Sequence, residues 1–282
     1  MTLMYSVNGL ALQNKAAGYQ LMDATQYGGA LTMRNTQLQP PNFHGHVPVW
    51  NAPMDSGQIQ FRIRITGTDQ DTLNTRWNGL VRRLGVGTNQ PVTLTRSRST
   101  GGSTNGRFTT VAGQLIGLEA PDFSCPANYV EATLTFSIPE GRWFAAEAEE
   151  ILTIPGQNQV VDLAAEGTLP ITAMQFKVKG PVSSFSVTDN VSQTGFAWSG
   201  ANILSTQWLV VDLATFTAWQ KTTNDYDNTG TNVSANLRMT NLGWLSLVPG
   251  IAPGHSTSDV TISASGTTGA TTCTLRARPA YH

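Results

Sequence analysis

Charged side chains are scarce in this chain. Among its 282 residues, 17 are Lys or Arg and 18 are Asp or Glu, which amounts to 12% of the chain and a net charge of −1. An ordinary soluble domain carries about 25% charged residues. Without a basic surplus there is no electrostatic basis for tight binding to nucleic acid or to a membrane surface, so the composition favours neither class of partner.

Cysteines and long apolar runs are also missing. The only two cysteines, Cys125 and Cys273, lie far apart in the sequence, and we expect both to be reduced. No segment approaches the roughly 18 consecutive apolar residues of a membrane span. Residues 1–10 have neither the basic start nor the apolar core of a secretory signal. We therefore expect no membrane partner and no export through a signal of its own.

Metal-binding motifs are weak. His44 and His46 would share one face of a strand, but no Cys or carboxylate stands beside them, and a structural zinc site needs four ligands. A calcium-like pattern opens at Asp225, yet its twelfth position is Asn236 rather than the bidentate Glu that such a loop requires. We expect a solvated turn at Asp225, and no metal or other cofactor.

Catalytic motifs are missing too: there is no G-x-S-x-G elbow and no glycine loop followed by a phosphate-binding lysine. The densest acidic group, Glu147, Glu149 and Glu150, is interpreted as a solvated linker, although the paired carboxylates of a glycan hydrolase need only be close in space. Four tryptophans of the second half could form a sugar platform, but core or edge packing is commoner in a β-sandwich: Trp198, Trp208, Trp219 and Trp244. We expect no catalytic residue and no enzyme.

The clearest positive signal is at residues 58–85. Phe61, Ile63 and Ile65 alternate with polar residues, which predicts a strand with one buried face. After Gly67, apolar residues recur at helical spacing and predict a helix over residues 68–84 with Thr68 as N-cap and Gly85 as its stop. The apolar stripe consists of Leu73, Trp77, Leu80, Val81 and Leu84, and we expect all of these except Val81 to pack on the sheet.

The rest of the chain has the pattern of an all-β protein, mainly antiparallel sandwiches, with that one docked helix. A strand pair is expected around the turn dipeptide Asn8-Gly9, and a long proline-bearing arm over residues 35–56. The acidic break at residues 145–150 predicts two domains, 1–145 and 151–282. Turn signals every eight to twelve residues predict a β-sandwich for the second. Its expected strands include residues 160–163 and 244–248.

Four segments of the chain belong together as a pattern: Tyr5-Ser6-Val7-Asn8-Gly9-Leu10, Phe43-His44-Gly45-His46, the strand and helix of residues 61–85, and the strand of residues 130–138 with Pro139-Glu140-Gly141-Arg142-Trp143. Taken together, they resemble the distal tail protein (Dit) family of phages with long non-contractile tails. The resemblance covers the layout of the whole chain. It implies an N-terminal ring-forming domain and a peripheral, galectin-like or jelly-roll second domain that lacks the galectin His-Asn-Pro-Arg sugar signature.

The resemblance implies a structural virion protein at the tail tip, assembled in the host cytoplasm. Such proteins form a homo-oligomeric ring, expected here to be a hexamer, that joins the tail tube protein to the tail-tip hub protein. Receptor-binding proteins are possible further partners, and the genome passes through the lumen without specific binding. Since an arm that cannot pair in its own sheet gains by packing on a neighbour, we expect four residues at the subunit boundary: Arg34, His44, His46 and Trp50.

Two alternatives stay open at this stage. The second domain could be a module that docks a carbohydrate or a receptor-binding protein, which an exposed line of aromatic residues in a groove would favour. The chain could also be a glycan hydrolase on a β scaffold, which two buried carboxylates within about ten ångströms in a cleft would favour.

Overall fold

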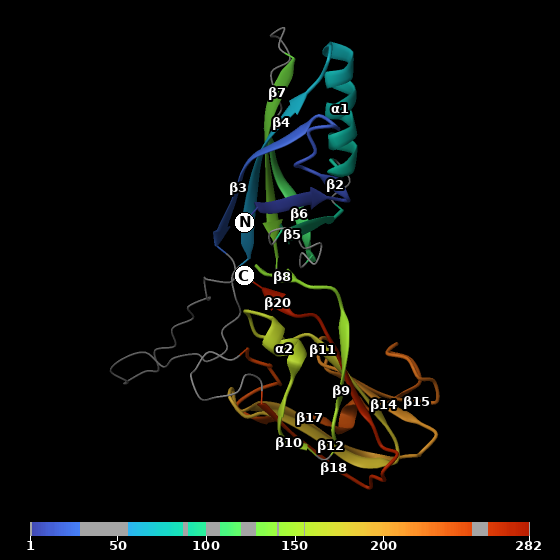
Figure 1. The fold of residues 1–282 in the computed structure, drawn as a ribbon. Helices are drawn as coiled ribbons and strands as arrows, with labels where there is room; N and C mark the ends of the chain where they lie inside the picture. Colours follow the sequence, from blue (N-terminus) through green and yellow to red (C-terminus); the bar gives the residue numbers. More distant parts are fainter. Residues whose placement is uncertain are drawn as a thin grey trace, which may run out of the picture. The chain divides into compact units, whose positions relative to one another are not determined.

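The computed structural model describes residues 2–28, 56–86, 90–99, 108–119, 128–139, 141–154, 156–249 and 259–281. The chain divides into two compact units, one from Met1 to Ala145 and one from Ala146 to Tyr281 (Figure 1). No helix in these described ranges is long and apolar enough to cross a membrane.

Unit 1 is an antiparallel sheet with one helix. Its strand order is β2-β1-β5-β6-β7-β4-β3, and β8 joins beside β6. The strands are β1 (Thr2–Val7), β2 (Leu10–Ala11), β3 (Tyr19–Gly28), β4 (Gly57–Thr66), β5 (Val92–Ser99), β6 (Phe108–Glu119), β7 (Tyr129–Ile138) and β8 (Trp143–Phe144). The predicted Asn8-Gly9 turn between β1 and β2 is confirmed, with both residues at positive φ (44° and 78°).

The core of unit 1 follows the predicted alternation. On β4, Ile59, Phe61, Ile63 and Ile65 are fully buried, while the residues between them are partly or fully exposed. The Phe61 ring contacts the rings of Tyr5, at 5.1 Å between centroids, and Phe136, at 5.9 Å. Burying one such aromatic side chain contributes about 1.5–3 kcal/mol.

Helix α1 (Gln70–Arg83) packs beside β4, as the sequence predicts (Figure 1). Its start differs: Asp69, not Thr68, is the N-cap, because the Asp69 carboxylate accepts the Thr72 amide at 2.7 Å. Gly85 follows the helix at φ 62°, the left-handed stop that the sequence predicted. Leu73, Leu80 and Leu84 are buried, whereas Trp77 and Val81 are only partly buried.

Unit 2 is a sandwich of two antiparallel sheets. The five-stranded sheet has the order β10-β18-β12-β13-β17, and the six-stranded sheet the order β16-β15-β14-β11-β19-β9. Their strands are β9 (Ala148–Leu152), β10 (Gly156–Val160), β11 (Met174–Lys179), β12 (Val182–Asp189), β13 (Thr194–Ile203), β14 (Trp208–Asp212), β15 (Thr217–Lys221), β16 (Thr231–Asn232), β17 (Leu237–Asn241), β18 (Asp259–Ser265) and β19 (Cys273–Ala277). The short strand β20 (Ala280–Tyr281) follows at the end of the chain.

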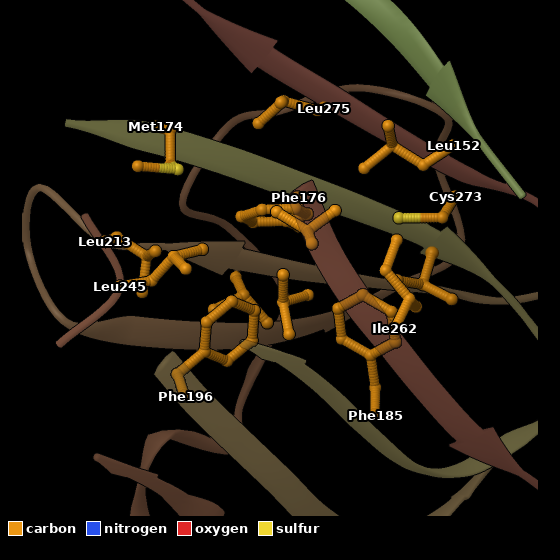
Figure 2. Packing of buried hydrophobic residues seen from close by; sticks show 14 of the residues in the cluster. Leu152, Met174, Phe176, Phe185, Phe196, Leu213, Leu245, Ile262, Cys273 and Leu275 are labelled. Carbon is orange, nitrogen blue, oxygen red and sulfur yellow. The ribbon is translucent and has the colours of Figure 1, made fainter. Parts of the chain in front are cut away.

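Three phenylalanines fill the space between the two sheets. Phe176 of β11 contacts Phe196 of β13 at 5.2 Å between ring centroids, and Phe185 of β12 lies 5.8–6.1 Å from both (Figure 2). Leucines and Cys273 surround this cluster. The all-β fold class predicted from the sequence is confirmed.

Two strand predictions for unit 2 are wrong. Residues 162–166 form the short helix α2 (Asp162–Glu166) rather than a continued strand. Residues 244–248 form no strand, since only Leu247 makes an isolated bridge, to Ile171. Both segments carry short apolar runs whose periodicity does not separate a strand from buried irregular structure.

Candidate functional site

The four residues expected at a subunit boundary, Arg34, His44, His46 and Trp50, lie outside the described residues, as does Cys125. Their role stays a prediction. Cys273 is buried in the core of unit 2, and its burial raises the pKa of its thiol, which suits an inert packing residue.

In the calcium-like segment, the side chain of Lys221 occupies the oxygen ligands. The Asp225 carboxylate accepts hydrogen bonds from the ammonium group of Lys221 and from the Asp227 amide at 3.1 Å. The Asp227 carbonyl accepts a second bond from Lys221, at 2.7 Å. Across the described part of the chain, no group of three or more His, Cys, Asp or Glu side chains is placed to hold a metal ion.

The acidic group at residues 147–150 is not a solvated linker, because it lies in and beside β9. The strand pairs with β19, which sets Glu149 opposite Arg276. Glu150 points to α2, where its two carboxylate oxygens accept the amides of Asp162 (3.0 Å) and Leu163 (3.1 Å). Burial raises the Glu150 pKa, although these two hydrogen bonds act in the opposite direction.

On the exposed face of unit 1, one carboxylate serves two arginines. Glu131 of β7 accepts from the guanidinium groups of Arg62 and Arg64 of β4, each at 2.7 Å. The Arg64 guanidinium also lies 4.6 Å from the centroid of the Tyr129 ring. Hydrogen bonds from Arg64 and then Arg62 lower the Glu131 pKa. The cluster keeps one positive charge in excess on a sheet face that is open to solvent.

In unit 2 the six-stranded sheet turns a polar face outward. Buried Phe176 and Val178 of β11 face the core, so Gln175, Lys177 and Lys179 lie on the other face. The segment of residues 222–230, which joins β15 to β16, supplies Tyr226 to cover this face. The Tyr226 ring centroid lies 4.2 Å from the Lys177 ammonium and 4.2 Å from the Arg276 guanidinium.

Polar bonds fix the 222–230 segment to the sheet. Buried Asp212 accepts from the side-chain amides of Asn228 (2.9 Å) and Gln175 (3.1 Å), and from the backbone amides of Ala214 and Thr215. The Tyr226 hydroxyl, by contrast, is buried with no hydrogen-bond partner among the described residues. Burial raises the Tyr226 pKa, and the nearby Glu149 charge raises it further.

The same segment forms one wall of a cavity of about 400 Å³. We call this the polar cavity; it is lined by Gln207, Gln220, Lys221, Thr222, Thr223, Thr229, Gly230 and Thr231. A second, smaller hollow of about 210 Å³ lies in unit 1 between the end of α1 and β6. No Asp or Glu lines either of them.

The four tryptophans of unit 2 do not form one platform. Trp198 is buried and donates to the Val233 carbonyl at 3.3 Å. Trp219 donates to the Thr217 hydroxyl, and Trp244 contacts Phe216 in a tilted arrangement at 4.8 Å between ring centroids. Trp208 lies on the outer face beside Lys177, at 5.6 Å. The packing interpretation is confirmed for Trp198, whereas Trp208, Trp219 and Trp244 are partly exposed. The register of β14 with β15 places Trp208 and Trp219 on the same outer face of the six-stranded sheet.

The sequence reasoning missed the polar cavity and its anchor Asp212. Residues 224–232 had the composition of a loop, and this was the one available signal. No pattern among neighbouring residues indicates that the segment folds over the sheet, because its partners on β11 and β14 are up to 51 residues away in the sequence.

Comparisons with known proteins establish the fold. Neither the protein-family models nor the curated proteins gave a match. Among solved structures, the Dit (gp 19.1) protein of phage SPP1, described as a paradigm of the hub adsorption apparatus in phages that infect Gram-positive bacteria, aligns at a TM-score of 0.62 and 10% identity over 100% of both chains. Chains of the phage P2 baseplate in its activated conformation, with Ca or with Sr, align at 0.39 and 0.38, with 11% and 10% identity over 99% of this chain and 98% of theirs. The latter two TM-scores are too low to establish a shared overall fold, whereas the first shows that this chain has the fold of SPP1 Dit.

Proposed function

We propose that this chain is a structural protein of a phage tail, a distal tail protein whose ring joins the tail tube to the tail-tip hub. The observation that carries the proposal is the alignment with SPP1 Dit over the full length of both chains. A match to one sandwich alone would be weak support, because β-sandwiches host many functions. Here both units match in the same order along the chain.

The chemistry of the described residues agrees with a structural role. The carboxylates with shifted pKa values and Tyr226, one of three described tyrosines whose pKa is raised, all sit in contacts that hold the fold: Asp69 caps a helix, Glu131 pairs with arginines, Glu150 caps a helix and Tyr226 covers a sheet. A glycan hydrolase would need two carboxylates beside a cleft. Neither described cavity carries one, so we do not favour that alternative.

The proposal includes partners and location. We expect a homo-oligomeric ring, a hexamer, in the virion tail tip, assembled in the host cytoplasm. The tail tube protein and the tail-tip hub protein would bind its two faces, and receptor-binding proteins would dock at its periphery. The genome would pass through the lumen without specific contacts, and Arg34, His44, His46 and Trp50 would lie near the subunit boundary.

The direct test is the mass and shape of the purified full chain. Six copies of the 30.2-kDa chain weigh about 181 kDa, and light scattering with negative-stain microscopy would resolve a closed ring at that mass. Because ring formation can require a neighbour, the measurement is repeated with the co-expressed tail tube protein. A monomer under both conditions, together with its absence from purified tails by immunogold labelling, would overturn the proposal.

A further inference from the structure

We propose that the polar cavity of unit 2 binds a neutral, hydroxyl-rich ligand, that is, a saccharide. Its volume of about 400 Å³ lies within the range of roughly 300–1,000 Å³ for small-molecule sites. Its lining is made of amide and hydroxyl side chains, with one lysine and one glycine. Without an apolar wall, the cavity offers nothing to a lipid or to an aliphatic ligand.

The lining has hydrogen-bonding capacity that the fold does not use. Thr222, Thr223 and Thr229 are exposed, and their hydroxyls make no hydrogen bond to a described residue. The Gln220 amide donates to the Gln207 side-chain oxygen at 2.7 Å, which leaves the Gln220 oxygen as an acceptor and the Gln207 nitrogen as a donor. Mixed donors and acceptors of this kind match vicinal hydroxyls, each of which both donates and accepts.

Charge at the cavity is already compensated. The Lys221 side chain is only 2% exposed, and its ammonium donates to the Asp225 carboxylate and the Asp227 carbonyl. An anionic ligand would need a positively charged side chain that is not already paired with a carboxylate. No charged residue other than Lys221 lines the cavity. This excludes a phosphate or a sulfate as the preferred ligand and leaves a neutral one.

The wall of the cavity is preorganised. Asn228 bonds to Asp212 on β14, and the buried Tyr226 ring fixes the centre of the same segment on the sheet. Gly230 adopts φ 109°, and a Cβ there would stand 2.5 Å from the Gln220 carbonyl oxygen, so only glycine lets the segment approach β15. A rigid wall lowers the entropy cost of ordering a weakly bound ligand.

The test uses the labelled full chain on an array of neutral, sulfated and phosphorylated oligosaccharides, followed by saturation-transfer NMR with the best neutral one. We expect binding to neutral glycans, with magnetisation transfer to the sugar ring. The double variant Thr222→Val/Thr229→Val removes two hydroxyls and preserves side-chain shape; it should weaken binding by about tenfold or more. The matched control, Thr75→Val on the exposed side of α1 in unit 1, should bind as the parent does.

Three results would overturn the proposal: no transfer to any neutral glycan at about 10 mM, a concentration that detects even weak sites; binding that the double variant leaves unchanged; or a preference for sulfated or phosphorylated glycans. Circular dichroism of the double variant is the check that it is folded, so that a loss of binding reports on the site. The proposal stands apart from the ring, because a chain that forms no ring would still bind the glycan, and a ring would form without it.

Discussion

The two units carry charge in different ways. Residues 1–145 hold eleven of the 17 Lys and Arg residues but only eight of the 18 Asp and Glu residues, which gives +3, whereas the remainder of the chain holds six and ten, which gives −4. The near-neutral total therefore hides a cationic unit and an anionic one. The net charge of the whole chain is therefore a poor guide to the charged molecules that each unit could bind.

The placement of the charges differs as well. In unit 1 the best-formed ion pairs, those of Glu131 with Arg62 and Arg64, lie on a solvated face. In unit 2, Lys177, Asp212 and Lys221 are each less than 10% exposed, beneath or beside the 222–230 segment. Exposed pairs are worth little, whereas buried charged groups are costly to disturb. The described ion pairs of Glu131 thus lie on the outer face of unit 1, whereas in unit 2 Asp212 and Lys221 bond to the 222–230 segment and hold it in place.

The largest expected effect tests whether the units are separate at all. Phe61→Ala in unit 1 and Phe185→Ala in unit 2 each leave a cavity in a core, at a cost of about 3–5 kcal/mol. If the units fold independently, each substitution shifts one transition in urea unfolding, followed by tryptophan fluorescence and circular dichroism. A single transition that both substitutions shift equally would make the chain one cooperative domain.

A smaller effect contrasts buried with exposed carboxylates. Asp212→Ala strands the amides of Gln175 and Asn228 and should cost about 2–4 kcal/mol. Glu131→Ala breaks an exposed ion pair with Arg62 and a partly buried one with Arg64, and should cost no more than about 1 kcal/mol. Limited proteolysis should then cut Asp212→Ala within residues 222–230. Equal costs for the two variants would remove the contrast between the units.

The third effect concerns Lys177, a buried lysine that forms no ion pair with a described carboxylate. Lys177 is 8% exposed and no described acid forms an ion pair with it; its ammonium lies between the rings of Tyr226 and Trp208. Lys177→Met keeps the stem and removes the desolvated charge, so stability should be unchanged or rise by about 1 kcal/mol. A loss of more than about 2 kcal/mol in thermal unfolding would show that the cation–π contacts outweigh burial.

The sequence predicted the elements whose pattern is local. The β4 alternation and the apolar stripe of α1 need only a few neighbouring residues to be recognised, and both were found, with the cap misplaced by one residue. Strand β9 was not recognised, because its acidic residues Glu149 and Glu150 are typical of a solvated linker. The structure shows that the strand also lacks a regular apolar face, since Ile151 is 79% exposed. Only pairing with β19, more than 100 residues later, makes that segment a strand.

The candidate site was less predictable than the fold. Asp212 and the 222–230 segment meet through tertiary contacts, so no spacing in the sequence indicates the cavity that they shape. The contact between the rings of Phe216 and Trp244 was equally unpredictable. Phe216 adopts φ 55°, a conformation that disfavours bulky residues, and its partner lies in a different part of the chain. Local propensity argues against this geometry, and packing overrides it.

The smallest effect is a pH dependence of opposite sign in the two units. In unit 1 the pKa of Glu131 is lowered by Arg64 and Arg62, and that of Asp69 by the Thr72 amide. A lowered native pKa stabilises the fold above the unfolded value, 4.5 for Glu131, and that stability is lost as the pH falls through the native pKa. In unit 2 burial raises the Glu150 pKa, so its contribution is present below 4.5 and is lost as the pH rises through the native pKa.

Acidification from pH 7 to pH 4 should therefore lower the free energy of unfolding of unit 1. In unit 2, protonation of Glu150 should raise it. The measurement is urea unfolding of each transition at the two pH values, with Glu131→Gln and Glu150→Gln compared with the parent so that the other carboxylates cancel. Glu131→Gln should flatten the loss in unit 1. Glu150→Gln, which resembles the protonated acid, should abolish the gain in unit 2. A loss of stability at low pH that Glu150→Gln removes from unit 2 would mean that its two amide hydrogen bonds to α2 outweigh burial.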